Sequence, residues 1–478
     1  MLFNSIDFAL FLPIIFILYW FVTNKNLKLQ NLLIVFSSYV FYGWWDWRFL
    51  SLILFSTIID YLIGISLTKQ ENLTKRKILL WTSIIVNLGF LGFFKYYNFF
   101  LDNFINAFSF FGNTINANSL NIILPVGISF YTFQTLSYSI DIYKRKLEPT
   151  KDFIAFSAFV SFFPQLVAGP IERASNLLPQ FYTKRHFDYT KAVDGIRQIL
   201  WGLFKKVVIA DNCAQYANMI FNNSSEYSGS TLVMGAIFFT FQIYGDFSGY
   251  SDIAIGTSRL FGFNLRQNFA FPYFSRDIAE FWRRWHISLS TWFRDYLYIP
   301  LGGSRGGTWN KIRNVFIIFL VSGFWHGANW TFIIWGGLNA LYFLPVFITN
   351  NNRNNLNIVA QDKYLPSAKE FLSILLTFAL TVFAWIFFRA NNVEHAIDYI
   401  IGIFSNSFFT IPDIMPKSIF LLLAFFISIE WCGRSGEHAL SNIFKIKKRF
   451  YRWFFYLFIF LLIFIYQGQQ QEFIYFQF

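Results

Sequence analysis

The sequence predicts an all-α, polytopic integral membrane protein, and three features of its composition carry that prediction. Hydrophobic residues make up 55% of the 478 residues and charged residues only 14%, well below the roughly 25% of a soluble domain. Aromatic residues reach 23%, with 67 Phe, which suits lipid-facing surfaces and interfacial belts. Apolar runs of spanning length recur along the chain, from residues 3–22 to residues 453–466.

The first apolar run, residues 3–22, is expected to be a retained helix, because it has no basic start and no small-residue cleavage site. The net charge of +13 does not indicate nucleic-acid binding, since the basic residues lie in short loops between apolar runs. Cys213 and Cys432 show no CxxC or Cys/His spacing. Neither a metal site nor a disulfide framework is therefore expected.

Loop charges predict the topology of the first five spans. Basic loops follow the first, third and fifth apolar runs, at residues 25–28, 69–77 and 143–151. The loops between them are nearly neutral or contain no Lys or Arg, as in residues 101–119. The positive-inside rule then places the N-terminus outside. A multi-pass protein of the cytoplasmic (inner) membrane is expected.

The alternation fails at residues 153–168, an apolar segment with basic residues on both sides and with Pro164 inside it. A re-entrant or broken segment is predicted here, and an ordinary span with a locally violated charge bias is the alternative. Non-helical backbone at membrane depth is tolerated only against protein or a water-filled cavity. The middle of the chain is therefore expected to line a cavity. Residues 350–369 are polar and Asn-rich, which predicts a surface loop.

The stretch FPYFSRDIAEFWRRWHISLSTWFRDYLYIPLGGSRGG, residues 271–307, is the densest in chemically active side chains. On a helix over residues 277–297, charged side chains such as Arg283 fall on one side and aromatic ones such as Trp282 on the other. This pattern predicts an amphipathic helix that lies at an interface or walls a polar cavity. His286 falls near the edge of the apolar face, as a site residue or as an interfacial histidine that caps a carbonyl.

The apolar run IIFLVSGFWHGANWTFIIW, residues 317–335, contains one ionisable side chain, His326. Ser322 lies one helical turn earlier on the same face, and Gly323 and Gly327 would let another backbone approach closely. Ionisable residues inside a membrane are functional candidates. The alternative is a buried histidine that bonds to a neighbouring helix.

Two carboxylates, Asp246 and Asp252, flank Gly249 in otherwise apolar sequence. They could orient an imidazole or coordinate water in a cavity. The favoured interpretation is structural: they would satisfy backbone donors where glycines break a helix.

Several other features are interpreted without a catalytic role. GGSRG at residues 302–306 fits G-x-S-x-G but is expected to be a loop, because a nucleophile elbow follows a strand. His186, His395 and His438 are expected at the surface. The tail FIYFQF, residues 473–478, is expected to be an interfacial anchor.

Together, these stretches resemble the membrane-bound O-acyltransferase superfamily. The resemblance is carried by FWRRWHISLSTWFRDYLYIPLGGSRGG at 281–307, SGFWHGANWTFIIWG at 322–336, FFPQLVAGPIER at 162–173, YGDFSGYSDIAIG at 244–256 and the terminal FIYFQF. The openings FNSIDFALFLPIIFILYW and SSYVFYGWWDWRFL are similar to the bacterial branch typified by the alginate O-acetylation membrane protein. The family's fold implies about eleven transmembrane helices plus re-entrant and amphipathic segments around a central cavity. One domain over residues 1–478, with a motif-bearing core at about 120–390, is expected.

The resemblance implies acyl transfer across the membrane. The donor would be acetyl-CoA or an acyl-carrier thioester from the cytosol, and no bound cofactor, metal or nucleic acid is expected. The acyl group, expected to be acetyl, would reach hydroxyls of a cell-envelope or extracellular polysaccharide. A partner, an extracytoplasmic (periplasmic) acyltransferase or a small membrane protein, would complete delivery.

The resemblance also implies roles for individual residues. His326 matches the family's most consistent catalytic residue, and His286 matches a position that is histidine or asparagine depending on the subfamily. Residues expected to contact the substrate or line its tunnel are Ser322, Asp246, Asp252, Trp282, Arg283 and Trp325.

The chemistry of an imidazole agrees with that role. A neutral His326 could take the acceptor hydroxyl's proton as the thioester sulfur departs, a contribution of roughly 10²–10⁴-fold. Apolar surroundings favour the neutral form, and a dry site limits hydrolysis of the thioester. His286 would polarise the acyl carbonyl or orient the acceptor. Among Ser and Cys only Ser322 is well placed as a nucleophile, and direct transfer or a partner's hydroxyl is favoured.

Other functions stay open at this stage. D-alanyl transfer to teichoic acid and peptidoglycan O-acetylation would use the same fold. A solute transporter is the alternative from a different class, but it would be expected to show internal repeats and facing charges, and neither is evident. The acceptor, the donor, the partner and the oligomeric state are not decided by the sequence.

Overall fold

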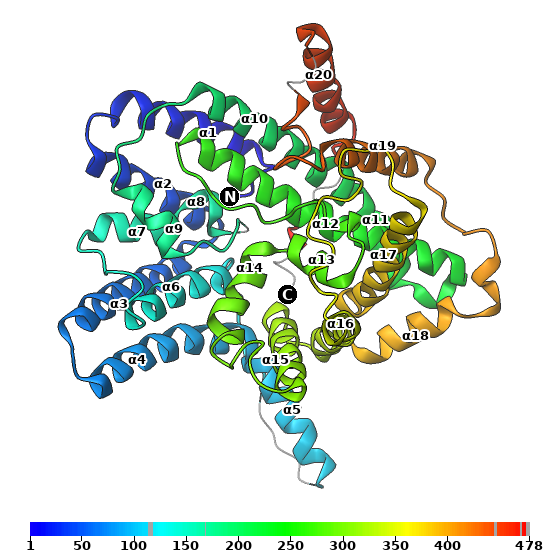
Figure 1. The fold of residues 1–478 in the computed structure, drawn as a ribbon, viewed down its shortest axis with the longest axis horizontal. Coiled ribbons are helices and arrows are strands. Elements are labelled where there is room, and N and C mark those ends of the chain that lie inside the picture. The colour runs from blue at the N-terminus through cyan, green and yellow to red at the C-terminus, as the bar shows by residue number, and fades with distance from the viewer. Residues whose placement is uncertain (113–117, 168, 444–446, 469–470, 475–478) are drawn as a thin grey trace. The chain divides into compact units, whose positions relative to one another are not determined.

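The computed structural model describes residues 1–112, 118–167, 169–443, 447–468 and 471–474, and in these ranges every regular element is helical (Figure 1). The all-α prediction is confirmed for this part of the chain. The chain divides into two compact units. The first comprises Met1–Ala192 and Thr257–Leu265, and the second comprises Val193–Gly256 and Arg266–Phe478.

The first ten α-helices, of which the last runs across the boundary between Ala192 and Val193, are α1 (Ile6–Ile17), α2 (Leu27–Asp46), α3 (Leu50–Lys69), α4 (Leu73–Leu91), α5 (Tyr97–Phe110), α6 (Ile128–Tyr143), α7 (Phe153–Ser161), α8 (Phe163–Leu166), α9 (Ala174–Leu177) and α10 (Tyr189–Leu203). Helices α3, α4 and α6 pack side by side (Figure 1). Polar caps fix several starts, such as Asn26, whose side chain accepts the backbone N–H groups of Lys28 and Leu29 at the start of α2.

The helices that follow are α11 (Asp211–Asn222), α12 (Gly229–Leu260), α13 (Ile278–Arg284), α14 (Ile287–Phe293), α15 (Thr308–His326), α16 (Trp330–Ile348), α17 (Ala368–Arg389), α18 (Val393–Ile403), α19 (Lys417–Gly433) and α20 (Arg449–Ile465). Helix α17 begins with a reciprocal capping box between Ser367 and Glu370. Helices α15 and α16 form an antiparallel pair, and α16 also packs against α17 (Figure 1).

Four helical segments in the described ranges are long and apolar enough to cross a membrane: Leu27–Lys69, Leu73–Phe110, Trp330–Ile348 and Ala368–Arg389. Shorter apolar helices occur at Ile6–Val22 and Phe153–Leu166. The polytopic membrane character is confirmed. The expected count of about eleven crossings stays a prediction.

The fifth apolar run lies between the loops at residues 101–119 and 143–151, and only its second part is helical. Helix α6 begins only at Ile128, after Gly127 adopts a left-handed backbone with φ of 74°. A Cβ at Gly127 would lie 2.6 Å from the carbonyl oxygen of Leu166. The close approach of this backbone therefore requires glycine and keeps the preceding residues out of the helix.

The predicted broken segment at residues 153–168 is confirmed up to residue 167, and residue 168 lies outside the described residues. Helix α7 ends at Ser161, and the chain bends at Phe162 before the short helix α8. The Oγ of Ser38 accepts the backbone N–H of Phe163 at 3.0 Å, so a neighbouring helix satisfies the interrupted backbone. Its return to the cytoplasmic side stays a prediction.

The single amphipathic helix predicted over residues 277–297 is wrong in detail. The chain leaves the helix after Arg284, and His286 adopts a left-handed conformation with φ of 42° before α14 begins. Backbone bonds explain the break: Ala270 N–H donates to the carbonyl of Arg284, and Ile287 N–H donates to the carbonyl of Asn268, both at 2.9 Å. An extended neighbouring segment thus replaces helical hydrogen bonds.

Candidate active site

His326 is the last residue of α15 and lies in a cage of aromatic rings. Its side chain is buried, with only 3% of the residue exposed. The ring centroids of Trp325, Trp335 and Phe388 lie 4.9, 5.1 and 5.4 Å from that of the imidazole, each close to edge-on. Three successive helices, α15, α16 and α17, therefore place apolar surface around one titratable ring.

The glycines beside His326 bring α15 and α16 into backbone contact, as the sequence predicts. A Cβ at Gly323 would collide with the carbonyl oxygen of Phe332, and one at Gly327 would collide with the Phe332 ring. Close approach at small residues is the usual way for membrane helices to pack. It sets the position of Trp335, one helical turn further along α16, against the imidazole.

Replacing Gly323 with alanine is expected to lower the apparent melting temperature of the purified protein in detergent. The added methyl has no space beside a backbone carbonyl, and such overpacking costs roughly 1–3 kcal/mol. Gly337→Ala is the matched control on α16, because a Cβ there would meet only Leu320, at 3.9 Å. Equal melting temperatures for the two variants would contradict this account of the α15–α16 contact.

His286 is held by an amide that the sequence did not reveal as a candidate. The Nδ1 atom lies 3.1 Å from Oδ1 of Asn268, and that oxygen also accepts the hydroxyl of Ser288 at 2.8 Å. The Nδ2 group of Asn268 donates to Oγ of Ser251 at 3.1 Å, which fixes the orientation of the amide. Since a carbonyl oxygen only accepts, Nδ1 of His286 carries the proton and Nε2 carries the lone pair.

Burial controls the charge of His286 as well as its tautomer. The residue is 1% exposed and lies between two seven-residue helices rather than in a spanning helix. Burial lowers the pKa of its imidazole to about 3, because the charged form loses its hydration. Phe247 meets the ring edge-on at a centroid distance of 4.7 Å. His286 is therefore neutral at physiological pH, with Nε2 as its basic atom.

One indole links the two histidines. The ring centroid of Trp325 lies 6.1 Å from that of His286 and 4.9 Å from that of His326. The fold thus brings together three residues that the sequence singled out, although they come from the α13–α14 junction and from the end of α15. Two imidazoles close to one apolar wall are suited to moving a proton.

A cavity of about 260 Å³ lies beside this cluster and contains two more of the predicted residues, Ser322 and Trp282. Ser322 is one turn before His326 on α15, and the ring of Trp282 packs against Trp335 with centroids 5.7 Å apart. The Nε1 atom of Trp282 is buried and, among the described residues, has no hydrogen-bond partner.

The same cavity has a polar and basic lining away from these rings. Arg294, Arg353, Ser290, Ser304 and Asn352 belong to that lining. The cavity therefore combines cationic side chains with an apolar wall adjacent to the histidine cage.

Arg283 supports a loop that contributes to this cavity, and its predicted contact with the substrate stays a prediction. Its guanidinium donates to the backbone carbonyls of Asn352 and Asn355 at 2.6 and 2.9 Å. The loop over residues 350–366 is irregular and mostly exposed, so the surface loop predicted over residues 350–369 is confirmed except at its end, where α17 begins at Ala368. By holding it, Arg283 places Asn352 and Arg353 at the cavity.

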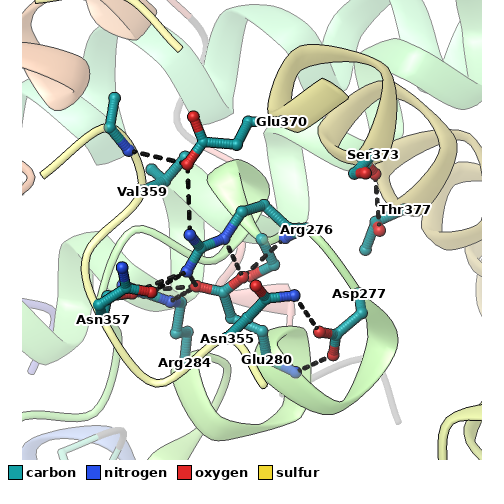
Figure 2. Close-up of polar contacts among 12 residues, drawn as sticks. Arg276, Asp277, Glu280, Arg284, Asn355, Asn357, Val359, Glu370, Ser373 and Thr377 are labelled. Carbon is teal, nitrogen blue, oxygen red and sulfur yellow. Dashed lines mark hydrogen bonds and ion pairs between the residues drawn. The ribbon is translucent and has the colours of Figure 1, made fainter. Parts of the chain in front are cut away.

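Figure 2 shows the ion-pair network that ties α13 to the same loop and to the start of α17. Glu280 binds Arg276 at 3.0 Å and Arg284 at 2.8 Å. Arg276 also reaches Glu370 at 3.3 Å and the carbonyl oxygen of Asn357 at 2.8 Å. Helix α13, which carries Trp282, is thereby fixed by charged groups from just before its first turn to its last residue.

Asp246 and Asp252 are engaged by consecutive lysines. Lys206 Nζ lies 2.8 Å from Oδ1 of Asp246, and Lys205 Nζ lies 2.6 Å from Oδ2 of Asp252. Helix α12 runs unbroken through Gly249, so the predicted helix break there is wrong. The glycine instead lets another backbone approach, because a Cβ would lie 2.8 Å from the carbonyl oxygen of Gly202. Tunnel-lining roles for the two carboxylates stay predictions.

The remaining histidines and cysteines contribute no second centre. His186 is exposed and His395 is half-buried, whereas His438 is buried and pairs with Asp194 at 3.1 Å, so its predicted surface position is wrong. Across the described ranges no group of three His, Cys, Asp or Glu side chains could hold a metal ion. The segment over residues 302–306 is an irregular turn region after a helical turn, as predicted.

Sequence reasoning missed Asn268, Trp335 and Phe388. The sequence signal for Asn268 was weak, because it is a single amide residue 18 positions before His286, with Arg266 shortly before it and Phe269 directly after it. The two aromatic residues carry no individual signal in a chain with 67 Phe and 16 Trp.

Comparison with known proteins gives a consistent result. The model of the membrane-bound O-acyltransferase family (MBOAT) matches residues 144–360, a range that contains both His286 and His326. A probable alginate O-acetylase of Pseudomonas aeruginosa is 41% identical over 400 residues, which cover 83% of this chain and 73% of that protein. A peptidoglycan O-acetyltransferase of Helicobacter pylori is 37% identical over 434 residues, covering 84% and 79%. A teichoic acid D-alanyltransferase of Bacillus subtilis is 29% identical over 292 residues, covering 58% and 71%.

Proposed function

The chain belongs to the membrane-bound O-acyltransferase family and is an O-acyltransferase of a membrane, and on this basis we propose that it transfers an acetyl group to hydroxyls of an envelope or extracellular polysaccharide. The observation that carries the proposal is the pair of imidazoles around Trp325, next to a cavity with a basic lining. The similarity to alginate and peptidoglycan O-acetylating enzymes supports acetyl and polysaccharide as donor group and acceptor class.

The donor is an acyl thioester, acetyl-CoA or an acylated carrier protein, presented from the cytosol. Its phosphate groups would lie near Arg294 and Arg353, where guanidinium groups suit phosphate oxygens. Its acyl end would lie toward Ser322 and Trp282, the apolar wall beside the cage. This placement brings the thioester carbonyl toward His326 and keeps water from it.

His326 acts as the general base in this scheme. The acceptor hydroxyl gives its proton to the imidazole while its oxygen bonds to the thioester carbonyl carbon. The tetrahedral intermediate then collapses, the carbon–sulfur bond breaks, and the imidazolium returns the proton to the departing thiolate. The products are an ester and a free thiol, so no further reactant is needed.

His286 orients the acceptor rather than polarising the acyl carbonyl. Because its Nδ1 proton is directed to Asn268, the neutral ring offers a lone pair at Nε2 and no proton there. A lone pair accepts a hydrogen bond from a second hydroxyl of the acceptor, which leaves the proton of the reacting hydroxyl for His326, but it repels a carbonyl oxygen. This supports the acceptor-orienting role among the two that the sequence leaves open.

The setting of the reaction is part of the same proposal. The chain would cross the cytoplasmic (inner) membrane about eleven times as one domain, with its N-terminus outside. An extracytoplasmic acyltransferase or a small membrane protein would pass the acyl group to the polysaccharide. D-alanyl transfer to teichoic acid is the second candidate, supported by the D-alanyltransferase relative.

Donor feeding separates these functions. Purified protein in lipid vesicles would receive acetyl-CoA or a D-alanyl carrier protein, each with a labelled acyl group, together with alginate, peptidoglycan or teichoic acid. We expect ester-linked label from acetyl-CoA on a polysaccharide when the partner is present. Label transferred from the D-alanyl carrier alone would support the second candidate. Movement of solute without donor consumption would contradict both and favour a transporter.

Neutralising the basic lining of the cavity should weaken donor binding. Arg353→Gln and Arg294→Gln are each expected to raise the KM for the thioester donor roughly tenfold to a hundredfold, the loss of about one charge-assisted hydrogen bond. The kcat should change less, because neither side chain belongs to the cage of aromatic rings around His326. Lys417→Gln, at the exposed start of α19, is the matched charge control. A KM shift as large in Lys417→Gln would contradict a donor site in this cavity.

A further inference from the structure

The C-terminal segment over residues 471–474 is buried, although the sequence suggests an anchor at the membrane interface. Phe473 is 0% exposed and Ile474 is 1% exposed. The interfacial prediction is therefore wrong for these two residues, and residues 475–478 lie outside the described residues. A short segment that is buried this completely needs a structural reason, because ordering its backbone costs about 1–2 kcal/mol per residue.

The backbone of this segment is bound by a buried group of charges. Lys206 Nζ donates to the carbonyl oxygen of Gln471 at 3.0 Å, and the N–H of Ile474 donates to Oδ2 of Asp246 at 2.6 Å. Lys206 also pairs with Asp246 and Asp211, each at 2.8 Å. Buried ions are costly unless each is fully partnered. The terminal segment supplies two of those partners.

A side chain of the same segment lies one ring away from His286. The ring of Phe473 packs on Tyr250 with centroids 4.3 Å apart and approaches Phe247 at 6.2 Å. Phe247 in turn meets the imidazole of His286 edge-on at 4.7 Å. Tyr250 and Phe247 both belong to α12, the helix that also carries Asp246.

We propose that residues 471–474 are a positioning element of the active site, seated on Lys206 and Asp246 and holding Phe247, and through it His286, in the geometry for acyl transfer. Phe473 is then a positioning residue and not a catalytic one, since it acts on His286 through Phe247. The expected effect on acyl transfer rests on the function proposed above. The placement of Phe247 and His286 by residues 471–474 does not depend on that function.

Two pairs of variants separate the side-chain contact from the backbone contact. Phe473→Ala removes the ring, whereas Phe473→Leu keeps most of the apolar volume. Ile474→Pro removes the N–H that Asp246 accepts, whereas Ile474→Val keeps it. We expect Phe473→Ala and Ile474→Pro to lower kcat on the order of 10²-fold, as a small misplacement of a reacting group does. The KM for the donor should stay unchanged, and the conservative variants should restore kcat.

Chemical modification provides a readout that needs no enzyme activity. Diethyl pyrocarbonate acylates accessible imidazoles, and peptide mass spectrometry reports each histidine separately. In the wild-type protein we expect His286 and His326 to be protected and His186 to react. In Phe473→Ala and Ile474→Pro we expect His286 to react faster while His326 stays protected.

The outcomes distinguish this proposal from its premise. Wild-type rates of His286 modification in both variants would overturn it, and so would equal deprotection of His286 and His326, which indicates general loosening. Unchanged kcat in both variants would also overturn the positioning role. Selective deprotection of His286 in a protein that transfers no acyl group from any donor would instead contradict the proposed function alone.

Discussion

Replacing His326 with alanine is expected to lower kcat for acyl transfer by roughly 10²–10⁴-fold, the range that a general base contributes. The imidazole sits among Trp325, Trp335 and Phe388, and none of these three aromatic side chains is a base that could replace it. The KM for the donor should change little, because the cavity lining that we assign to the donor lies on other residues. Steady-state kinetics with labelled donor in vesicles measure both quantities.

The control for His326→Ala is His186→Ala, the same substitution at an exposed histidine. It should leave kcat at the wild-type value. A His326→Ala protein with normal kcat and a raised KM would assign His326 to donor binding. That result would contradict its role as base.

The second large effect is expected at His286 and Asn268. His286→Ala should lower kcat on the order of 10²-fold, because the acceptor molecule loses a group that orients it. Asn268→Ala should cost nearly as much. It removes the acceptor that holds the Nδ1 proton, and a ring in the wrong tautomer or rotation no longer presents Nε2.

A double-mutant cycle tests whether Asn268 acts through His286. The double variant should be no slower than His286→Ala alone, since residues that work as one unit are not additive. Additive losses would show that Asn268 acts elsewhere. His286→Asn should retain more activity than His286→Ala, because asparagine keeps a hydrogen-bond acceptor at the position.

Composition and periodicity were sufficient for the fold class and for the burial of the two central histidines. A chain with 14% charged residues cannot cover itself with water, and the helical content follows. Gly323 and Gly327 correctly indicated a close helix contact, because small residues at that spacing have few other uses in a membrane. The family motifs then gave roles to His326 and His286 that periodicity alone could not.

The local structure at His286 could not be predicted from the same pattern. A helical projection treats residues 277–297 as isolated, but the backbone of Asn268 and Ala270 pairs with the junction at residues 284–287. The spacing of apolar residues along the sequence carries no information about such tertiary hydrogen bonds. The left-handed backbone of His286 is unusual for a side chain other than glycine, and it turns the imidazole toward Asn268.

The charged residues of the core misled the sequence analysis for a related reason. Asp246 and Asp252 were predicted to satisfy backbone donors at a helix break caused by nearby glycines. Their partners, Lys206 and Lys205, instead lie 40 or more positions earlier in the chain. The burial of His438 against Asp194 is likewise set by a contact across 244 residues. Ion pairs between distant segments leave no periodic signal, so their partners emerge only from the fold.

The most direct test of the central claim is label transfer from acetyl-CoA to polysaccharide by the purified protein with its partner, for the wild type and for His326→Ala side by side. The account predicts ester-linked label for the wild type and a yield of labelled polysaccharide that is reduced at least about 10²-fold for His326→Ala. It also predicts that the His326→Ala protein is folded and still binds the donor. Equal label transfer by the two proteins would contradict it.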